Sequence, residues 1–455
     1  MSNSRDLTQG AVWRKLLQLA GPMMFGIIAV ISVSLVDTYY VGRLGTEQLT
    51  ALSFTFPVTM TVSSLAIGLG AGASSVVSRA VGSDDTDHAR RLATDSLALA
   101  LIIVSLVAVA GYFSIDFLFG LLGAQGEILD LITRYMQIWF LAIPFLVVPI
   151  VANAIVRATG DAFWPSVVMV GSALTNIAIT PVFVFGLGPV PAFGIEGAAI
   201  GTLVAWLVTV VGAFLLVGWR EQMIDMSVPE IGTLMTSWKR VLGVGIPAAI
   251  GNASNPVGIA VVTSILAGFG SVVVAGFGVA TRIESLSVIP MLALSSAIGP
   301  FSGQNWGAGK CGRVKEALRV SYAVCGVWAV VLGLFFWVAA EPIVRIFSQE
   351  TEVVQAAVTY LTIVPLSLWG YGAVIVTAGA FNALGRSHYG LGIYMVRIAA
   401  LYIPASYIAS LFFAQSDGVF YAIAGANALA GVCVMAFALH WLSANDDKAG
   451  AKVPA

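Results

Sequence analysis

One carboxylate stands inside the first long apolar stretch of the chain, VWRKLLQLAGPMMFGIIAVISVSLVDTYYV (12–41). Asp37 has Ser34 one turn before it and Tyr40 one turn after it, and Pro22 lies upstream in the same stretch. An acid at the centre of a membrane helix costs about 2.5–3.5 kcal/mol on insertion scales, so such acids face the protein interior and commonly carry protons or ions. The alternative is a structural acid near the outer interface, held by hydrogen bonds.

A second polar pair occurs in another apolar stretch, where Pro181 follows Asn176 and Thr180. Residues four positions apart lie on one face of a helix, so these two side chains point the same way. They can pack against a neighbouring helix, or they can supply oxygen atoms to an ion site that includes Asp37.

A third group is the pair Arg282 and Glu284, within VATRIESL. Residues two positions apart do not face each other on a helix, so each is expected to take a different partner. Arg397 is one candidate partner. Ion pairing that neutralises the two charges and binding of a cationic substrate by Glu284 are both open interpretations.

Tyr135, Gln137 and Asn153 lie together in a further apolar stretch and can either line a cavity or pack. Burial raises the pKa of a carboxylate, so Asp37 can take up a proton near neutral pH, whereas a bound Na⁺ would keep it ionised. The expected coupling ion is therefore H⁺ or Na⁺, with Asp37 and Asn176 as the candidate Na⁺ ligands. No other cofactor is expected.

The composition requires elements that cross a membrane. The chain has 455 residues, of which 58% are hydrophobic and only 10% charged, against about 25% charged in soluble domains. The net charge is −1 and no basic tract occurs, so nucleic acid is not an expected partner. The three cysteines (Cys311, Cys325 and Cys433) have no metal-ligand spacing and are interpreted as reduced packing residues.

A membrane-spanning helix needs about 20 mainly apolar residues, and twelve segments qualify. They are 14–41, 48–79, 92–119, 127–156, 165–187, 195–219, 240–268, 274–305, 315–343, 353–384, 390–413 and 420–442. The sequence therefore predicts an all-α integral membrane protein. The polar segment 220–239 is expected to be an inner-face linker with a short amphipathic helix.

Lys and Arg in short loops mark the cytoplasmic side of a membrane protein. With the N-terminus inside, the outer loops keep only Arg43, Arg134 and Arg345, and the other loop and terminal basic residues, including Arg5, Lys448 and Lys452, fall inside. Both termini are therefore predicted to be cytoplasmic. Span one is retained as a helix, because it is too long for a signal-peptide core and lacks a cleavage site.

The chain repeats itself at a shift of 225 residues. WRKLLQLAGP from Trp13 aligns with WKRVLGVGIP from Trp238, and Tyr135 aligns with Tyr360. Two six-helix bundles with parallel topology are expected: 1–219 as the N-lobe and 240–443 as the C-lobe, joined by 220–239, with 444–455 as a tail. A substrate path between the lobes is expected. Asp37 aligns with Val262, so only the first repeat carries this acid.

Several motifs together resemble the multidrug and toxic compound extrusion (MATE) family. They are VDTYYVGRLG, SRAVGSDDTDHARR, its counterpart GQNWGAGKCGRVKEAL, RATGD and NIAITPVFVFG. The resemblance covers essentially the whole chain. It implies a monomeric, ion-driven exporter of amphipathic, often cationic organic compounds in the inner membrane of a prokaryote, working by alternating access of two six-helix lobes.

The resemblance also assigns roles to residues. It matches Asp37 to the coupling acid of the first helix, Pro22 to a proline where that helix bends, and Thr202 to an ion-site position. Much of the family carries Asn-x-x-x-Asp-Pro where this chain has Asn176, Thr180 and Pro181, so a second carboxylate is missing here. A relay of a proton between two carboxylates is therefore not expected.

The same resemblance extends to the second lobe. Glu284 becomes a candidate for binding cationic substrate. Asn255 and Tyr371 stand where the sodium-coupled branch carries acids, which places the chain closer to the branch named for damage-inducible and archaeal transporters.

Two other function classes remain as alternatives. A flippase for a lipid-linked saccharide would need a more basic cavity than Arg282 and Arg397 provide. A membrane-embedded enzyme would need clustered His, Asp or Ser-Lys groups within spans, and the sequence offers none.

Overall fold

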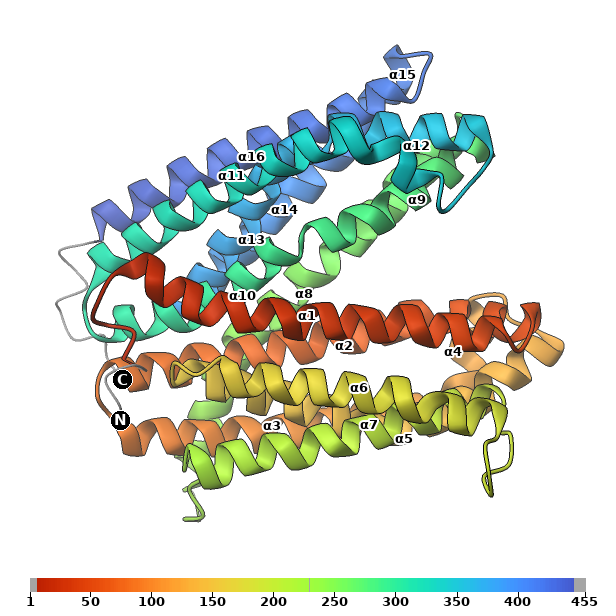
Figure 1. Cartoon of the computed structure of the whole chain (residues 1–455). Helices are drawn as coiled ribbons and strands as arrows, with labels where there is room; N and C mark the ends of the chain where they lie inside the picture. The colour runs from red at the N-terminus through yellow and green to blue at the C-terminus, as the bar shows by residue number, and fades with distance from the viewer. Residues whose placement is uncertain (1–5, 229, 446–455) are drawn as a thin grey trace. The chain divides into compact units, whose positions relative to one another are not determined.

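The computed structural model describes residues 6–228 and 230–445, and all of the regular structure in these ranges is helical (Figure 1). Arg5, Lys448 and Lys452, which entered the orientation prediction, lie outside the described residues. Eleven helices in the described ranges are long and apolar enough to cross a membrane, and a bent pair makes a twelfth span. The predicted all-α class with twelve spans is confirmed.

Two compact units divide the chain, and each is described by itself. Unit 1 comprises Gly21–Ala249 and unit 2 comprises Asp6–Ala20 with the chain from Ile250 onward. The divisions fall within helices rather than in the linker, so α1 (Val12–Gly42) and α8 (Ile231–Ala267) each contribute residues to both units. Pro22 lies in α1 one residue beyond the division, and α1 passes through it as a single helix.

Besides its parts of α1 and α8, unit 1 contains the helices of the first repeat. They are α2 (Thr46–Gly82), α3 (Thr86–Phe113), α4 (Ile115–Leu121), α5 (Gly126–Ala158), α6 (Phe163–Phe185), α7 (Ile195–Phe214) and the π-helical η1 (Leu215–Arg220).

Unit 2 contains the helices of the second repeat. They are α9 (Ser271–Ser287), α10 (Ile289–Gly307), α11 (Cys311–Val344), α12 (Thr351–Ile363), the 3₁₀ turn η2 (Pro365–Ser367), α13 (Leu368–Ala383), α14 (Ser387–Met395), the π-helical η3 (Val396–Tyr402), α15 (Ile403–Phe412) and α16 (Asp417–Ala444).

Several spans are interrupted where the sequence predicted single helices. The predicted 92–119 span is wrong in its second part: α3 ends at Phe113, and α4 follows after Ser114. The apolar pattern continues through this break, so hydropathy alone does not reveal it. The eighth span bends by 45° between α9 and α10, where Pro290 occupies the first turn of α10 and lacks a backbone donor.

The helix expected within 220–239 begins at Ile231 and is continuous with the seventh span rather than a short element of its own. Residues from Ile231 onward form the first turns of α8, which continue directly into the seventh span. This part of α8 packs in unit 1, because added Cβ atoms at Gly68 and Gly72 of α2 would collide with the backbone oxygens of Gly245 and Val241. These two glycines of α2 therefore serve close helix packing.

Asp95 of α3 is an acid near the start of a predicted span, and its side chain is 1% exposed. Arg91, one turn earlier, forms an ion pair with it at 2.8 Å and also donates to the Ser227 carbonyl at 2.6 Å. The linker is therefore held on α3 around a buried charge pair.

In unit 2 the chain segment before α1 forms a strap, defined as residues 6–10, on the ends of α10 and α11. The side chain of Leu7 is 1% exposed. Its carbonyl accepts from Asn305 Nδ2 at 3.1 Å and from Arg313 at 3.2 Å, and Lys310 Nζ donates to the Thr8 carbonyl at 3.0 Å. These hydrogen bonds fix the start of the first span to the second repeat.

Candidate ion and substrate sites

In unit 1 the helix that carries Asp37 packs on α6. The Tyr40 hydroxyl of α1 donates to the Ile177 carbonyl of α6 at 3.3 Å. Farther along the same pair, the Ser166 hydroxyl donates to the Met23 sulfur at 3.6 Å. Asp37 lies in α1 one turn before Tyr40 and is half-buried.

The three predicted ion-site residues of α6 and α7 come together. Asn176 Nδ2 donates to Thr202 Oγ1 at 3.4 Å, and the Thr202 hydroxyl donates to the Ala198 carbonyl at 2.9 Å. Thr180 is fully buried, and a Cβ at Gly201 would lie only 2.5 Å from its Oγ1. The absence of a side chain at Gly201 therefore lets α7 approach α6 at the level of Thr180.

Six buried oxygen atoms of unit 1 have no hydrogen-bond partner among the described residues. Two belong to Asp95, which forms an ion pair with Arg91, and the other four are Asp37 Oδ1, Asn176 Oδ1, Thr180 Oγ1 and Asn153 Oδ1. Most buried polar atoms in proteins are hydrogen-bonded, so each such oxygen requires an explanation. A proton on the carboxyl group would satisfy Asp37, and a hard cation could take several of the oxygens as ligands, so this set of groups is suited to either.

The residues predicted to line the cavity from α5 differ in burial. Tyr135 is 8% exposed and Asn153 is 4% exposed, and Tyr135 lies close enough to Asp37 for an electrostatic interaction. Gln137 is exposed. The structure therefore brings Tyr135 near the acid, whereas no hydrogen bond links Gln137 to it within the described ranges.

In unit 2 the polar residues gather around Arg397, which lies in η3 and is 5% exposed. Its Nε donates to Asn427 Oδ1 of α16 at 3.0 Å, and its Nη1 donates to Asn255 Oδ1 of α8 at 2.9 Å. The guanidinium carbon lies 4.3 Å from the Tyr371 ring centre and 5.4 Å from that of Tyr402. Asn255 and Tyr371, which stand where the sodium-coupled branch of the family carries acids and which are also expected in the substrate cavity, thus contact a residue predicted as a partner of Glu284.

The structure gives Glu284 and Arg282 different surroundings. The Glu284 carboxylate of α9 accepts from the Tyr360 hydroxyl of α12 at 2.6 Å and lies within electrostatic range of Arg397. The Arg282 side chain is exposed and has no ion-pair partner among the described residues. Glu284 therefore has neighbours other than Arg282, and the two side chains form no ion pair with each other in the described part of the chain.

Sequence reasoning missed Asn427 as a member of this group. The signal for it was present in the repeat, because Asn427 aligns with Thr202 at the shift of 225, just as Tyr360 aligns with Tyr135. The matching helices of the two repeats thus carry their polar groups at matching places.

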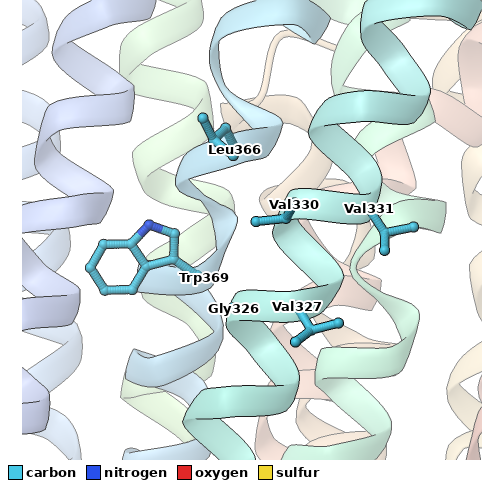
Figure 2. A pocket seen from close by; sticks show the side chains of 6 residues that line it. All are labelled: Gly326, Val327, Val330, Val331, Leu366 and Trp369. Atoms are coloured by element: carbon cyan, nitrogen blue, oxygen red, sulfur yellow. The ribbon is translucent and has the colours of Figure 1, made fainter.

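Unit 2 also has an apolar hollow, whose lining includes none of these polar residues. Figure 2 shows its lining side chains, Val327, Val330 and Val331 of α11 with Leu366 and Trp369 of the η2–α13 segment. No ionisable side chain lines it, and Val327 is 68% exposed. This hollow is suited to contact with lipid chains and lacks the groups needed for ion or substrate chemistry.

Long apolar helices that enclose buried polar groups in each of two repeats define a multi-pass membrane transporter. The MatE family model matches residues 22–182 and 247–408, and the chain belongs to this family. The two matches begin at Pro22 and Pro247, which is the offset of the internal repeat.

Individual relatives are similar along nearly their whole length. The FAD transporter of Shewanella oneidensis is 35% identical over 432 residues, covering 95% of each chain. The multidrug export protein MepA of Staphylococcus aureus is 24% identical and covers 93% of each. The crystal structure of the Vibrio cholerae MATE transporter VcmN in the bent form has a TM-score of 0.90 at 27% identity, covering 96% of this chain and 98% of that one.

Proposed function

We propose that this transporter is an ion-coupled exporter of amphipathic organic compounds and that Asp37 is its coupling carboxylate. The observation that carries the proposal is the buried, unpartnered Oδ1 atom of Asp37, with unpartnered oxygens on Asn176 and Thr180 of the same unit. The expected topology is an inner-membrane monomer with both termini in the cytoplasm, based on the distribution of Lys and Arg.

Coupling requires that the ion and the substrate favour opposite states of the transporter, because a ligand that binds two states equally shifts neither. When Asp37 takes up an ion from outside, the unpartnered oxygens gain a partner and one state is stabilised. Substrate leaves on the outer side from that state. A proton is preferred over Na⁺, because Thr180 replaces the second carboxylate and a lower ligand charge weakens the binding of hard cations.

Two substrate classes fit this proposal. Cationic drugs fit Glu284 and the relatives that are multidrug exporters. A flavin dinucleotide is the second candidate, because the relative that is 35% identical over 95% of both chains is an FAD transporter.

Transport by proteoliposomes tests the coupling role. A pH gradient and a sodium gradient are imposed separately, and export of ethidium and of FAD is followed for the wild type and for Asp37→Asn. We expect gradient-driven export to vanish in Asp37→Asn while the protein still inserts and folds. Asp116→Asn, at an exposed acid of α4, is the control and should export at the wild-type rate. Export by Asp37→Asn at the wild-type rate would exclude the mechanism.

A further inference from the structure

The guanidinium group of Arg397 is a buried charge in the middle of a membrane-spanning segment. An arginine side chain cannot be deprotonated in a protein, so it keeps its charge there. Burial of an isolated charge is costly and is normally offset by a paired opposite charge. The partners that the structure gives to Arg397 are instead neutral: the amide oxygens of Asn255 and Asn427 and the ring faces of Tyr371 and Tyr402.

No carboxylate among the described residues forms an ion pair with Arg397. The nearest acid by interaction, Glu284, directs its carboxylate to the Tyr360 hydroxyl at 2.6 Å. One of the two terminal nitrogens of Arg397, Nη2, makes no hydrogen bond within the described ranges. The guanidinium fork therefore retains donor capacity. Asn255, Tyr371 and Glu284, which contact it or interact with it, are half-buried rather than fully buried.

The internal repeat allows the contacts of Arg397 to be compared with those at the corresponding spans of unit 1. Asn427, which holds Nε of Arg397, aligns with Thr202, which accepts from Asn176 in unit 1. Both contacts join the fifth and sixth spans of their repeat. The contact between these two spans thus joins two neutral side chains in unit 1 and includes a charged arginine in unit 2.

We infer that Arg397, oriented by Asn255 and Asn427, forms a subsite in unit 2 for the phosphate groups of an anionic dinucleotide substrate. The planar guanidinium group binds phosphate through two parallel N–H donors, which gives both affinity and orientation. The inference rests on the proposed export function and selects the dinucleotide class within it. Glu284 lies beside the subsite and can accept hydrogen bonds from donor groups of the same substrate.

A purely structural role for Arg397 is the competing explanation. In that case the arginine only joins α8, η3 and α16 through its two asparagine contacts. Such a role would affect every ligand of unit 2 equally, whereas a phosphate subsite affects only ligands that carry phosphate. Ligands that share one ring system and differ in phosphate content therefore separate the two explanations.

Binding is measured on the full chain in detergent micelles by quenching of flavin fluorescence, with riboflavin, FMN and FAD as ligands. For the wild type we expect FAD to bind more tightly than riboflavin and inorganic pyrophosphate to displace FAD but not riboflavin. In Arg397→Gln we expect FAD affinity to fall about tenfold or more, since a charge-assisted hydrogen-bond pair is lost, and riboflavin affinity to stay the same.

Arg397→Lys keeps the charge but loses the fork, and an intermediate FAD affinity is expected. Arg345→Gln, which removes an exposed arginine paired with Glu341 in the same unit, is the control and should bind FAD as the wild type does. Equal losses for FAD and riboflavin in Arg397→Gln would overturn the inference. So would a wild type that binds riboflavin as tightly as FAD without competition from pyrophosphate, an outcome that does not depend on the folding of any variant.

Failure of this inference is distinguishable from failure of the proposed function. FAD binding in micelles involves no gradient, so Asp37→Asn should retain the difference between FAD and riboflavin while losing driven export. If Asp37→Asn exports normally but Arg397→Gln loses FAD selectivity, the coupling proposal fails and the phosphate subsite stands.

Discussion

The Tyr360 hydroxyl donates to the Glu284 carboxylate at 2.6 Å, which joins α12 to α9 inside unit 2. The residue that aligns with Tyr360 in the first repeat is Tyr135, which interacts electrostatically with Asp37. Each repeat therefore places the same tyrosine near an acid, although the two acids stand at unrelated positions of the repeat. The tyrosine is inherited from the duplication, and the acids are individual to each half.

Tyr360→Phe should destabilise unit 2. Glu284 loses its side-chain donor, and leaving a buried charged group without its partner costs about 1–3 kcal/mol or more. The measurement is the thermal unfolding midpoint of the purified protein in detergent, which should fall. Tyr389→Phe is the matched control, because the Tyr389 hydroxyl makes no hydrogen bond to a described residue and its ring packs on Phe381 and Phe437. Equal midpoints for the two variants would show that the Glu284 contact contributes nothing.

Gly201→Ala should disturb the candidate ion site. The new Cβ would lie 2.5 Å from Thr180 Oγ1 and 2.7 Å from Thr180 Cα, so α6 and α7 must separate. Overpacking of this kind typically costs about 1–3 kcal/mol. We expect a lower unfolding midpoint and a reduced rate of ion-driven export.

Gly171→Ala in α6 is the control for this substitution. A Cβ at Gly171 meets no atom within 4 Å, and alanine is favoured over glycine within a helix by about 0.5–1 kcal/mol. Its midpoint should stay the same or rise. Gly201→Ala with wild-type stability and transport would mean that the close approach at Thr180 is not required.

The strap before α1 should respond to acid through Asp6. Burial raises the pKa of Asp6, but hydrogen bonds from the backbone and side chain of Thr8 and the charges of Lys310 and Lys15 outweigh burial and lower this pKa below its ordinary value. A lowered pKa stabilises the fold above the unfolded-state value of about 3.9, and this contribution disappears as the pH falls through the lower folded-state pKa.

Asp6→Asn should therefore lower the free energy of unfolding at pH 7 by less than about 1 kcal/mol, because solvent screens the charges. The unfolding midpoint should fall slightly as a result. At pH 3 the difference between wild type and variant should shrink, since the wild-type carboxyl is becoming protonated there. The measurement is the unfolding midpoint of wild type and Asp6→Asn at several pH values between pH 7 and pH 3. A difference that grows toward pH 3 would have the wrong sign and would exclude the electrostatic explanation.

Hydropathy predicts the spans well and their interruptions poorly. The twelve spans follow from apolar length, because a helix in lipid must satisfy its own backbone. The break at Ser114 escapes this reasoning, because apolar residues continue on both sides of it. Hydropathy also fails to predict that α8 starts at Ile231, because its first turns are polar and precede the membrane-spanning part.

The candidate sites show a similar division. Asn176 and Thr180 are predictable as a pair, because helical spacing alone puts them on one face. The group around Arg397 is not, since Asn255, Asn427 and Tyr371 come from three other spans and their meeting depends on tertiary packing. The one sequence signal for this group is the repeat, which aligns Asn427 with Thr202 and so indicates a polar residue at a corresponding place.

Arg91→Met should be strongly destabilising. Arg91 pairs with Asp95 at 2.8 Å, and the two side chains are 14% and 1% exposed. Removing one partner of a buried ion pair leaves an uncompensated charge, at a cost of about 3–5 kcal/mol. The unfolding midpoint in detergent should therefore fall by far more than in Arg90→Met, where the adjacent Arg90 forms only an exposed contact with Asp87 at 3.9 Å.

A double substitution separates the charge effect from lost packing. In Arg91→Met with Asp95→Leu both charges are replaced by apolar side chains, and the Asp95 backbone carbonyl that accepts from Trp238 Nε1 at 3.0 Å is kept. Replacing a buried ion pair by apolar residues of similar size is often neutral or stabilising, so the double variant should recover most of the lost midpoint. A double variant less stable than Arg91→Met alone would show that Asp95 is held by groups other than Arg91 and that the pair does not anchor the linker on α3.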